Sequence, residues 1–254
     1  VTAKINNYEV KDIWYKDNAR LVLKSEDTSP LKTVKCTVNG TEVNGVSTVT
    51  TNEISLDLEK YIDSNGLAEV VYTVEDYAGN STVYSKVIKV DVDEPVLTNG
   101  SLEGVINILD SVAYINKEIT LTASSFDYGS GVANVDVLKD GAIVSNKLPY
   151  TINSSGTYSI RVSDGVGHTV TKSLKELTGL DISKVVFDNE TPIIKRLSGF
   201  TADLVKDNIN WYRNIPALKL SIEDSNIKSV SIKVNEKEVI NTVSADCLYS
   251  IPIE

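Results

Sequence analysis

The chain has 254 residues, of which 41% are apolar and 24% charged, a balance typical of folded globular proteins and not of disordered chains. Its formal net charge of −10, with Lys and Arg scattered singly, excludes nucleic acid as a partner, and no stretch approaches the roughly 20 apolar residues that membrane insertion requires. The length suits two or three domains, and the lack of Met leads us to expect an internal fragment of an exported protein.

The first predicted strand recurs along the chain. The segments DIWYKDNARLVL (12–23), DSVAYINKEITL (110–121) and DNINWYRNIPALKL (207–220) share an acid, a tyrosine and alternating apolar positions. These tyrosines are nearly equally spaced, and each precedes two apolar residues two positions apart, as a strand with one buried face requires. The tyrosines are Tyr15, Tyr114 and Tyr212, and the apolar pairs are Leu21 with Leu23, Ile119 with Leu121, and Leu218 with Leu220.

The next predicted strand is also repeated, and it ends in a hairpin signal. Its copies are SPLKTVKCTVNG (29–40), SGVANVDVLKDG (130–141) and SNIKSVSIKVNE (225–236). Asn39-Gly40 and Asp140-Gly141 predict two-residue hairpin turns with positive φ angles, whereas Asn235-Glu236 is a weaker turn.

Further strands are expected at ISLDL (54–58), EVVYTVED (69–76) and TYSIRVSD (157–164), with short helical turns at 58–64 and 173–183. The segment TVEDYAGNST (73–82) resembles a catalytic loop, because an acid, a tyrosine, a glycine and an asparagine are close together. Its pattern returns, however, with Asp164, Gly167 and His168 in place of Asp76, Gly79 and Asn80. We therefore interpret it as a hairpin turn in which Asp76 accepts backbone N–H groups, Gly79 permits positive φ and Asn80 tolerates a left-handed conformation.

Short strands separated by turns indicate an all-β chain of tandem β-sandwiches. Pro95 and Pro192 follow acidic junctions and cannot donate to a strand ladder, so we place domain boundaries beside them. The predicted domains are 1–93, 94–190 and an incomplete third at 191–254. The predicted core residues are Leu21, Leu23, Val34, Cys36, Ile54, Leu56, Tyr72 and Val74 in the first domain, and Ile119, Leu121, Val135, Val137, Ile160 and Val162 in the second.

The segments DYGSGVANVDVLKDG (127–141), GTYSIRVSDGVGHTV (156–170) and VEDYAGNST (74–82) resemble the tandem bacterial immunoglobulin-like (Big-type) domains of cell-surface and adhesin-type proteins. The resemblance covers nearly the whole chain, and its motifs are structural. It implies immunoglobulin-like sandwiches at a bacterial surface or in a secreted protein.

Few residues offer catalytic chemistry. His168 is the one histidine, and it falls in a predicted surface turn, which argues against a Ser-His-Asp site or a multi-histidine metal site. Cys36 and Cys247 have apolar neighbours and are expected as small buried hydrophobes. Trp14 and Trp211 occupy equivalent places, where packing is favoured over a sugar-stacking platform. We therefore expect a chain that is not an enzyme.

The best chemical candidates are the carboxylates at the two predicted junctions. Calcium takes six to eight oxygen ligands, so junction carboxylates together with loop carbonyls could bind it and stiffen the link between domains. Acid-rich linkers are also commonly just solvated. No other cofactor is expected. The candidate ligands are Asp91, Asp93 and Glu94 at the first junction, and Asp188 and Glu190 at the second.

Together these features predict a non-catalytic stalk or adhesin segment on a bacterial surface, which projects a binding tip or itself contacts a host or cell-surface protein or glycan. The alternatives are an accessory carbohydrate-binding or spacer region of a secreted enzyme and a phage tail or virion decoration module.

The third copy has no counterpart of TYSIRVSD (157–164). Its strand at 230–234 would then have an open edge, where we expect a strand-complementing partner.

Overall fold

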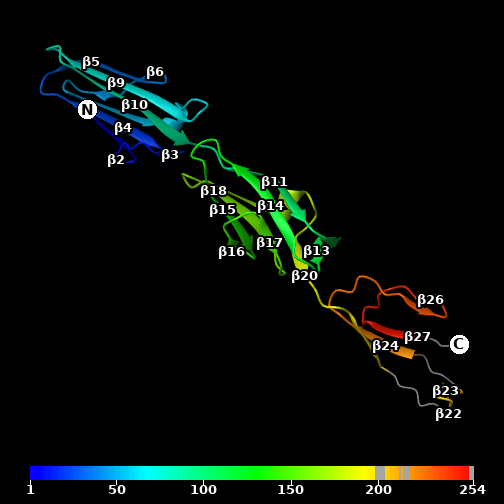
Figure 1. Ribbon diagram of the computed structural model, residues 1–254. Coiled ribbons are helices and arrows are strands. Elements are labelled where there is room, and N and C mark those ends of the chain that lie inside the picture. The colour runs from blue at the N-terminus through cyan, green and yellow to red at the C-terminus, as the bar shows by residue number, and fades with distance from the viewer. Residues whose placement is uncertain (198–203, 212, 214–217, 252–254) are drawn as a thin grey trace. The chain divides into compact units, whose positions relative to one another are not determined.

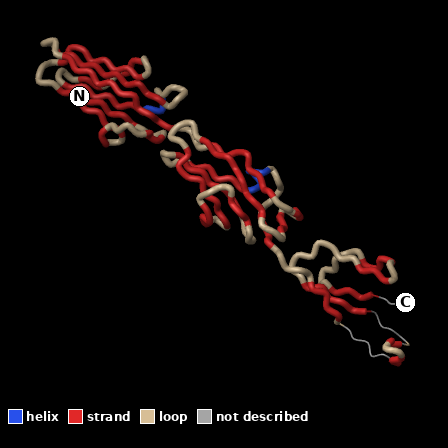
Figure 2. The backbone as a smooth tube through the Cα atoms, viewed as in Figure 1, coloured by secondary structure: helices blue, strands red, loops and turns tan. Residues whose placement is uncertain are grey.

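The computed structural model describes residues 1–197, 204–211, 213 and 218–251. The chain forms two compact units, one of residues 1–113 with 118–186 and one of residues 114–117 with 187–254. Strands and the turns between them make up almost all of the described chain (Figure 2). The tandem immunoglobulin-like β-sandwich class predicted from the sequence is confirmed.

The first sandwich has two five-stranded sheets, with strand orders β2-β1-β4-β8-β7 and β3-β10-β9-β5-β6 (Figure 1). Neighbouring strands are antiparallel except for β3 and β10, which pair in parallel. The strands are β1 (Thr2–Ile5), β2 (Tyr8–Glu9), β3 (Trp14–Lys16), β4 (Arg20–Glu26), β5 (Leu31–Val38), β6 (Thr41–Val43), β7 (Val46–Ser47), β8 (Thr51–Asp57), β9 (Leu67–Asp76) and β10 (Ser81–Asp91), and the expected helical turn is a 3-10 turn at Leu58–Lys60.

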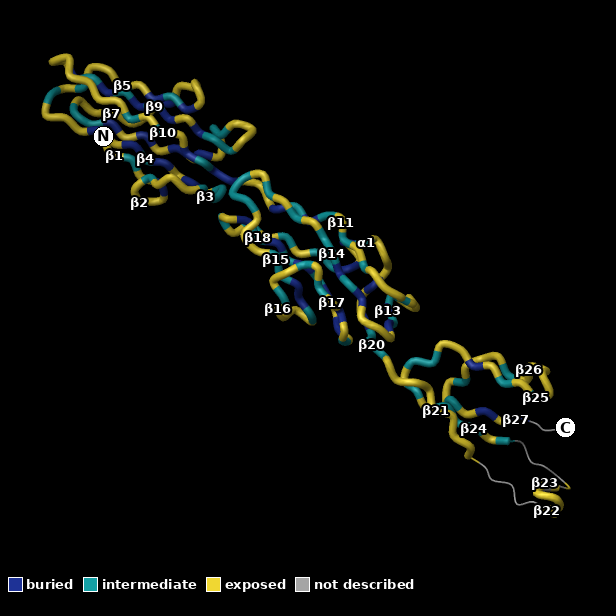
Figure 3. The backbone as a smooth tube through the Cα atoms, in the orientation of Figure 1, coloured by how far each residue is buried: buried dark blue, intermediate teal, exposed yellow. Residues whose placement is uncertain are grey.

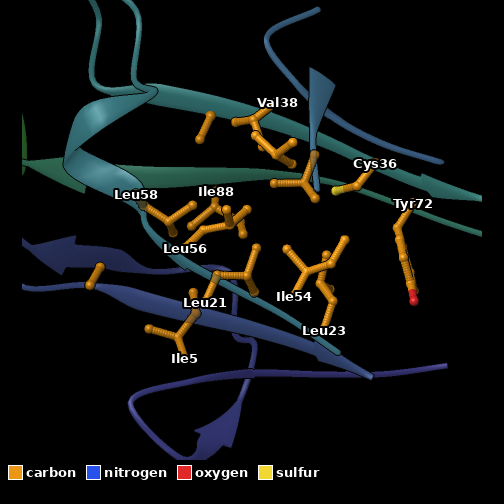
Figure 4. Packing of buried hydrophobic residues seen from close by; sticks show 14 of the residues in the cluster. Ile5, Leu21, Leu23, Cys36, Val38, Ile54, Leu56, Leu58, Tyr72 and Ile88 are labelled. Carbon is orange, nitrogen blue, oxygen red and sulfur yellow. The ribbon is translucent and has the colours of Figure 1, made fainter. Parts of the chain in front are cut away.

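The core of this sandwich lies between its two sheets. Alternation along β4 and β8 turns Leu21, Leu23 and Ile54 inward, and they face Cys36 and Tyr72 from the opposite sheet (Figure 4). Each large apolar side chain removed from water in this way contributes about 1.5 to 3 kcal/mol. Exposed and buried positions alternate along the strands (Figure 3), as period-two patterning predicts.

The second sandwich is built from the sheets β11-β14-β17, β12-β13-β20 and β16-β15-β18-β19. Its strands are β11 (Val96–Glu103), β12 (Asn107–Leu109), β13 (Val112–Ile115), β14 (Ile119–Phe126), β15 (Val132–Lys139), β16 (Ala142–Ser145), β17 (Tyr150–Ile152), β18 (Tyr158–Asp164), β19 (Thr169–Ser173) and β20 (Lys184–Phe187). The helical insertion predicted at 173–183 is α1 (Leu174–Thr178), which begins with a capping box formed by Ser173 and Glu176. Among the described residues, no helix has the length and hydropathy needed to span a bilayer.

The two sandwiches repeat one another in strand register. Cys36 lies opposite Tyr72 across β5 and β9, and Val137 lies opposite Ile160 across β15 and β18. Of the predicted core residues all are buried except Val34 and Val135, which are half-buried. Both of these follow a register shift at the start of their strand, between Leu31 and Thr33 in β5 and between Val132 and Asn134 in β15. The bulge interrupts the regular alternation there, so the prediction of full burial was wrong at this repeated position.

The predicted hairpin turns are confirmed. Asn39 and Gly40 have φ angles of 48° and 78°, and Asp140 and Gly141 have φ angles of 51° and 82°, so both pairs are left-handed as two-residue hairpins require. Asn235 and Glu236 also have positive φ angles.

The turn after β9 follows a different mechanism from the one predicted for Asn80. Gly79 has a φ of 90°, as expected, but Asn80 is not left-handed. Its side chain instead donates from Nδ2 to Asp76 Oδ2 at 2.9 Å, and its backbone N–H donates to Asp76 Oδ1 at 2.8 Å. The asparagine therefore stabilises the ionised carboxylate of the turn, whose pKa these hydrogen bonds lower.

The second unit contains the three-stranded sheet β21-β24-β27 and two hairpins, β22-β23 and β25-β26. In the described residues β25 pairs with β26 alone, whereas β5 and β15 each have a neighbour on both sides. Tyr212, the third repeated tyrosine, falls outside the described residues. The strands are β21 (Ile193–Arg196), β22 (Leu204–Lys206), β23 (Ile209–Trp211), β24 (Leu218–Glu223), β25 (Ile232–Val234), β26 (Lys237–Ile240) and β27 (Leu248–Ile251).

Candidate metal centre at the first junction

Asp91, the last residue of β10, places a buried carboxylate where the first sandwich leads into the second. Its side chain is 2% exposed. Oδ1 accepts the backbone N–H of Asp93 at 3.2 Å, and Oδ2 accepts the backbone N–H of Ser130 at 2.7 Å. Since Ser130 belongs to the loop before β15, this linker carboxylate is hydrogen-bonded to the second sandwich.

The loop from Asp127 to Gly131 is shaped to receive Asp91. Asp127 Oδ2 accepts the N–H groups of Gly129 at 3.1 Å and Gly131 at 2.7 Å, which leaves the N–H of Ser130 free to bind Asp91. A Cβ on Gly129 would collide with the Asp91 carboxylate, so this position needs glycine. The other oxygen of Asp127, Oδ1, is buried and has no hydrogen-bond partner among the described residues.

The equivalent loop of the first sandwich is one residue shorter. There the N–H of Ser29 donates to Asp27 Oδ1 at 2.8 Å, so the donor that corresponds to Ser130 is already used within its own loop. In the second sandwich the additional glycine leaves the N–H of Ser130 available to bind the carboxylate of Asp91.

Asp164 brings a second buried carboxylate to the junction from the turn after β18. Its Oδ1 accepts backbone N–H groups of Val166 at 3.0 Å, Gly167 at 2.6 Å and His168 at 2.8 Å. Burial alone would raise the pKa of Asp164, but the hydrogen bonds from the backbone and imidazole of His168 and from the two other N–H groups outweigh it and hold the pKa below its usual value. Asp164 is thus an ionised, fixed acceptor.

His168 differs from the surface residue that the sequence predicted. Its side chain is only 10% exposed, and Nδ1 lies 2.7 Å from Asp164 Oδ2, the place that Asn80 fills in the first sandwich. The prediction failed because the turn faces residues of the first sandwich. Lys16 Nζ donates to Gly167 O at 3.3 Å, and Asp17 Oδ1 lies 3.9 Å from His168 Nε2.

Several carboxylates and buried oxygens gather at the junction. Ligand atoms of Asp91, Asp164 and His168 lie within 4.8 Å of one another. Burial, and then the nearby charges of Asp91 and Asp164, raise the pKa of Asp127 despite its hydrogen bond from Gly131. Ser130 Oγ is also buried without a partner in the described part of the chain. Buried oxygens that lack partners beside fixed carboxylates are suited to a hard divalent cation such as Ca²⁺.

The five calcium ligands proposed from the sequence have different environments in the structure. Asp91 lies in the cluster, whereas Asp93 and Glu94 are exposed, and Asp93 contributes only its N–H to Asp91. Asp188 is half-buried, and its Oδ2 accepts a hydrogen bond from Asn226 Nδ2 at 2.6 Å, so its role as a calcium ligand stays a prediction. Glu190 is exposed and donates its N–H to Asp188 Oδ1 at 3.1 Å.

Sequence reasoning missed Asp127, Ser130, Asp164 and His168 as members of this site. Asp164 and His168 were recognised as turn residues, but nothing in one sequence shows that the turn faces a junction. A usable signal was the loop length, since the segment from Asp127 to Ser130 has one more residue than its counterpart from Asp27 to Ser29.

No protein-family model and no curated protein sequence matches the chain. Among solved structures, the chain is similar to fibronectin(III)-like modules of Clostridium thermocellum CbhA, with 16% identity, a TM-score of 0.35, and 73% of this chain and 94% of that chain covered. It is also similar to a 1.5-MDa bacterial ice-binding adhesin, with 15% identity, a TM-score of 0.34, and 94% and 82% covered.

A Ca²⁺-stabilised adhesin with which an Antarctic bacterium binds ice is similar at 14% identity and a TM-score of 0.33, with 99% of this chain and 65% of that chain covered. Likenesses of this size concern the fold alone. The function proposed below is supported by the junction residues.

Proposed function

We propose that this chain is a non-catalytic spacer segment of a bacterial cell-surface, adhesin-type protein, in which successive immunoglobulin-like sandwiches are coupled through their linkers. The observation that supports this most directly is the hydrogen bond from Ser130 N to Asp91 Oδ2 at 2.7 Å. A linker that only tethered two domains would not need a buried carboxylate or a glycine shaped around it. Coupling of consecutive domains is the property that a projecting stalk requires.

We further propose that Ca²⁺ binds at the first junction. Asp91 and Asp127 would supply carboxylate oxygens, with Ser130 Oγ as a neutral ligand. The support is the buried, unpartnered Oδ1 of Asp127 and the raised pKa of the same carboxyl, in which only Oδ2 receives hydrogen bonds, from Gly129 and Gly131. When bound, a cation would neutralise this charge and tie the linker to the loop of the second sandwich.

The experiment that tests coupling is ¹⁵N relaxation on the purified chain, with Ca²⁺ and with chelator. Coupled sandwiches should share one rotational diffusion tensor when Ca²⁺ is present, and chelator should allow each to reorient separately while both stay folded. The Asp127→Asn variant should behave like the chelated protein at every Ca²⁺ concentration. Independent reorientation of the two sandwiches under all conditions would contradict both the spacer and the calcium proposals.

The alternative of a carbohydrate-binding accessory region can be tested on the same material. A polar hollow beside β4, β7 and β8 offers hydrogen-bonding groups, but no aromatic side chain lines it for a sugar ring to stack on. Its lining includes Lys24, whose Nζ lies 2.8 Å from Glu53 Oε2. Saturable binding on a glycan array that is lost in Lys24→Ala would favour the accessory role over the spacer.

A strand-complementing partner at the third segment also stays a proposal. In the described residues the edge of β25 opposite β26 has no neighbouring strand, so its backbone groups can accept a further strand from this chain or another. Val234 pairs with Lys237 across the hairpin, so the N–H of Lys233 points to the open edge. Fast amide exchange at Lys233, slowed by addition of a partner, would support complementation. Slow exchange in the isolated chain would contradict it.

A further inference from the structure

At the boundary of the two sandwiches, one ring nitrogen of His168 faces the carboxylate of Asp17. The nitrogen that faces away from Asp164, Nε2, is buried and has no hydrogen-bond partner among the described residues. A buried polar atom without a partner is uncommon, because its desolvation is not repaid. It faces the carboxylate of Asp17, whose Oδ1 lies 3.9 Å away and whose side chain is 49% exposed.

The hydrogen bond to Asp164 fixes which nitrogen is available. An ionised carboxylate has only acceptors, so Nδ1 of the neutral imidazole must carry the hydrogen that bonds Asp164 Oδ2 at 2.7 Å. The lone pair is then on Nε2. Metal-binding histidines commonly have this arrangement, in which the other ring N–H donates to a carboxylate, a backbone carbonyl or water that orients the imidazole.

The distance between the two facing atoms suits a small transition ion. Zn²⁺ lies about 2.0 to 2.2 Å from imidazole nitrogen and carboxylate oxygen, so a tetrahedral angle would place those two atoms about 3.4 Å apart. The observed 3.9 Å needs only a small movement of the exposed Asp17 carboxylate. Oxygen-only sites favour Ca²⁺, whereas an imidazole ligand favours first-row transition ions.

We propose that His168 Nε2 and the Asp17 carboxylate bind a zinc-class divalent ion that bridges the first and second sandwiches, with water completing its coordination. The nearby carboxylates of Asp91 and Asp164 add favourable charge, while the ammonium of Lys16, held on Gly167 O, opposes it. Its proposed ligands, His168 Nε2 and Asp17, differ from the oxygen ligands of Asp91 and Asp127, so it does not require the calcium proposal to be correct.

The test uses the fact that the chain has one histidine. In long-range ¹H–¹⁵N spectra of the labelled chain, Zn²⁺ should move the Nε2 resonance of His168 while Nδ1 stays protonated. This signal belongs to His168 alone, so Zn²⁺ bound to a cysteine would not be mistaken for it. Ca²⁺ at the same concentration should not produce this shift, because an imidazole nitrogen is a poor ligand for it. Titration by calorimetry gives the affinity of Zn²⁺ for the chain.

Two variants make the result decisive. His168→Asn introduces the residue found at this position in the first sandwich, where Asn80 Nδ2 donates to Asp76 Oδ2 at 2.9 Å. This variant should therefore fold normally and no longer bind Zn²⁺ at this site. Asp17→Asn keeps the imidazole and should weaken Zn²⁺ binding at least about tenfold, since even second-shell changes do so. The proposal is overturned if Zn²⁺ leaves the Nε2 resonance unmoved, or if Asp17→Asn binds as tightly as the original chain, which would show binding by a lone histidine.

Discussion

Asp91 accepts the backbone N–H of Ser130 through Oδ2 at 2.7 Å, and the equivalent linker residue of the second unit, Asp188, accepts Asn226 Nδ2 through the same oxygen at 2.6 Å. In both linkers the other oxygen accepts the N–H two residues onward, at 3.2 Å and 3.1 Å. One carboxylate position is therefore used twice, with a different donor from the following loop each time. The linker aspartate is a structural element of the repeat and not a solvated spacer residue.

Gly129→Ala should release Asp91 from the second sandwich. The new Cβ would collide with the Asp91 carboxylate, which is the mobile end of a side chain and would swing away, so the hydrogen bond to Ser130 N would be lost. A hydrogen bond to a charged group contributes about 1.5 to 3 kcal/mol, and we expect amide exchange at Ser130 to accelerate correspondingly.

A double-mutant cycle provides the control for this variant. In an Asp91→Ala background the collision no longer exists, so Gly129→Ala should have little further effect on Ser130 exchange. An equal effect in both backgrounds would show that Gly129 acts through its backbone and not through Asp91.

Asp127→Asn should stabilise the chain in chelator and remove its response to Ca²⁺. The pKa of Asp127 is raised, so its contribution to stability is complete below the pKa of the unfolded chain and is lost as pH rises through the folded value. At pH 7 the charge is therefore unfavourable, and an amide oxygen can still accept the N–H groups of Gly129 and Gly131. Urea unfolding at pH 7 should show the variant above the original protein in chelator and below it in saturating Ca²⁺. Identical Ca²⁺ responses would exclude Asp127 as a ligand.

The sequence predicted what depends on local pattern and failed where tertiary contact decides. Period-two alternation and Asn-Gly or Asp-Gly pairs determine a strand's buried face and its hairpin, so Leu23, Tyr72 and the turn at Asn39 were predictable. The bulge that half-exposes Val34 has no comparable signal. The burial of His168 depends on which residues of another sandwich its turn meets, and no single-chain pattern encodes that.

Asp164→Asn should destabilise the second sandwich at neutral pH. The depressed pKa means that Asp164 contributes stability above its unfolded value of about 3.9, and this contribution is lost as pH falls through the lower, folded value. An amide keeps one acceptor oxygen but loses the charge that strengthens the bonds from Gly167 and His168, at a cost of about 2 kcal/mol. The difference in unfolding free energy between the two proteins should be full at pH 7 and shrink below about pH 4. A difference that does not change with pH would mean that packing, and not charge, is responsible.

Tyr72→Phe and Tyr84→Phe form a matched pair in the first sandwich, because each removes one hydroxyl from a ring that packs against the core. Tyr72 Oη lies 2.8 Å from Ser25 Oγ and donates to Asn52 Oδ1 at 2.8 Å, and all three residues are buried. Its loss leaves two buried polar side chains short of a partner, which should cost about 1 to 3 kcal/mol. The hydroxyl of Tyr84 is buried with no hydrogen-bond partner in the described residues, so removing it discards a desolvated group and should be neutral or slightly stabilising. Thermal and urea unfolding of both variants measure the contrast, and equal destabilisation by the two substitutions would show that hydrogen bonding to Ser25 and Asn52 does not stabilise the sandwich.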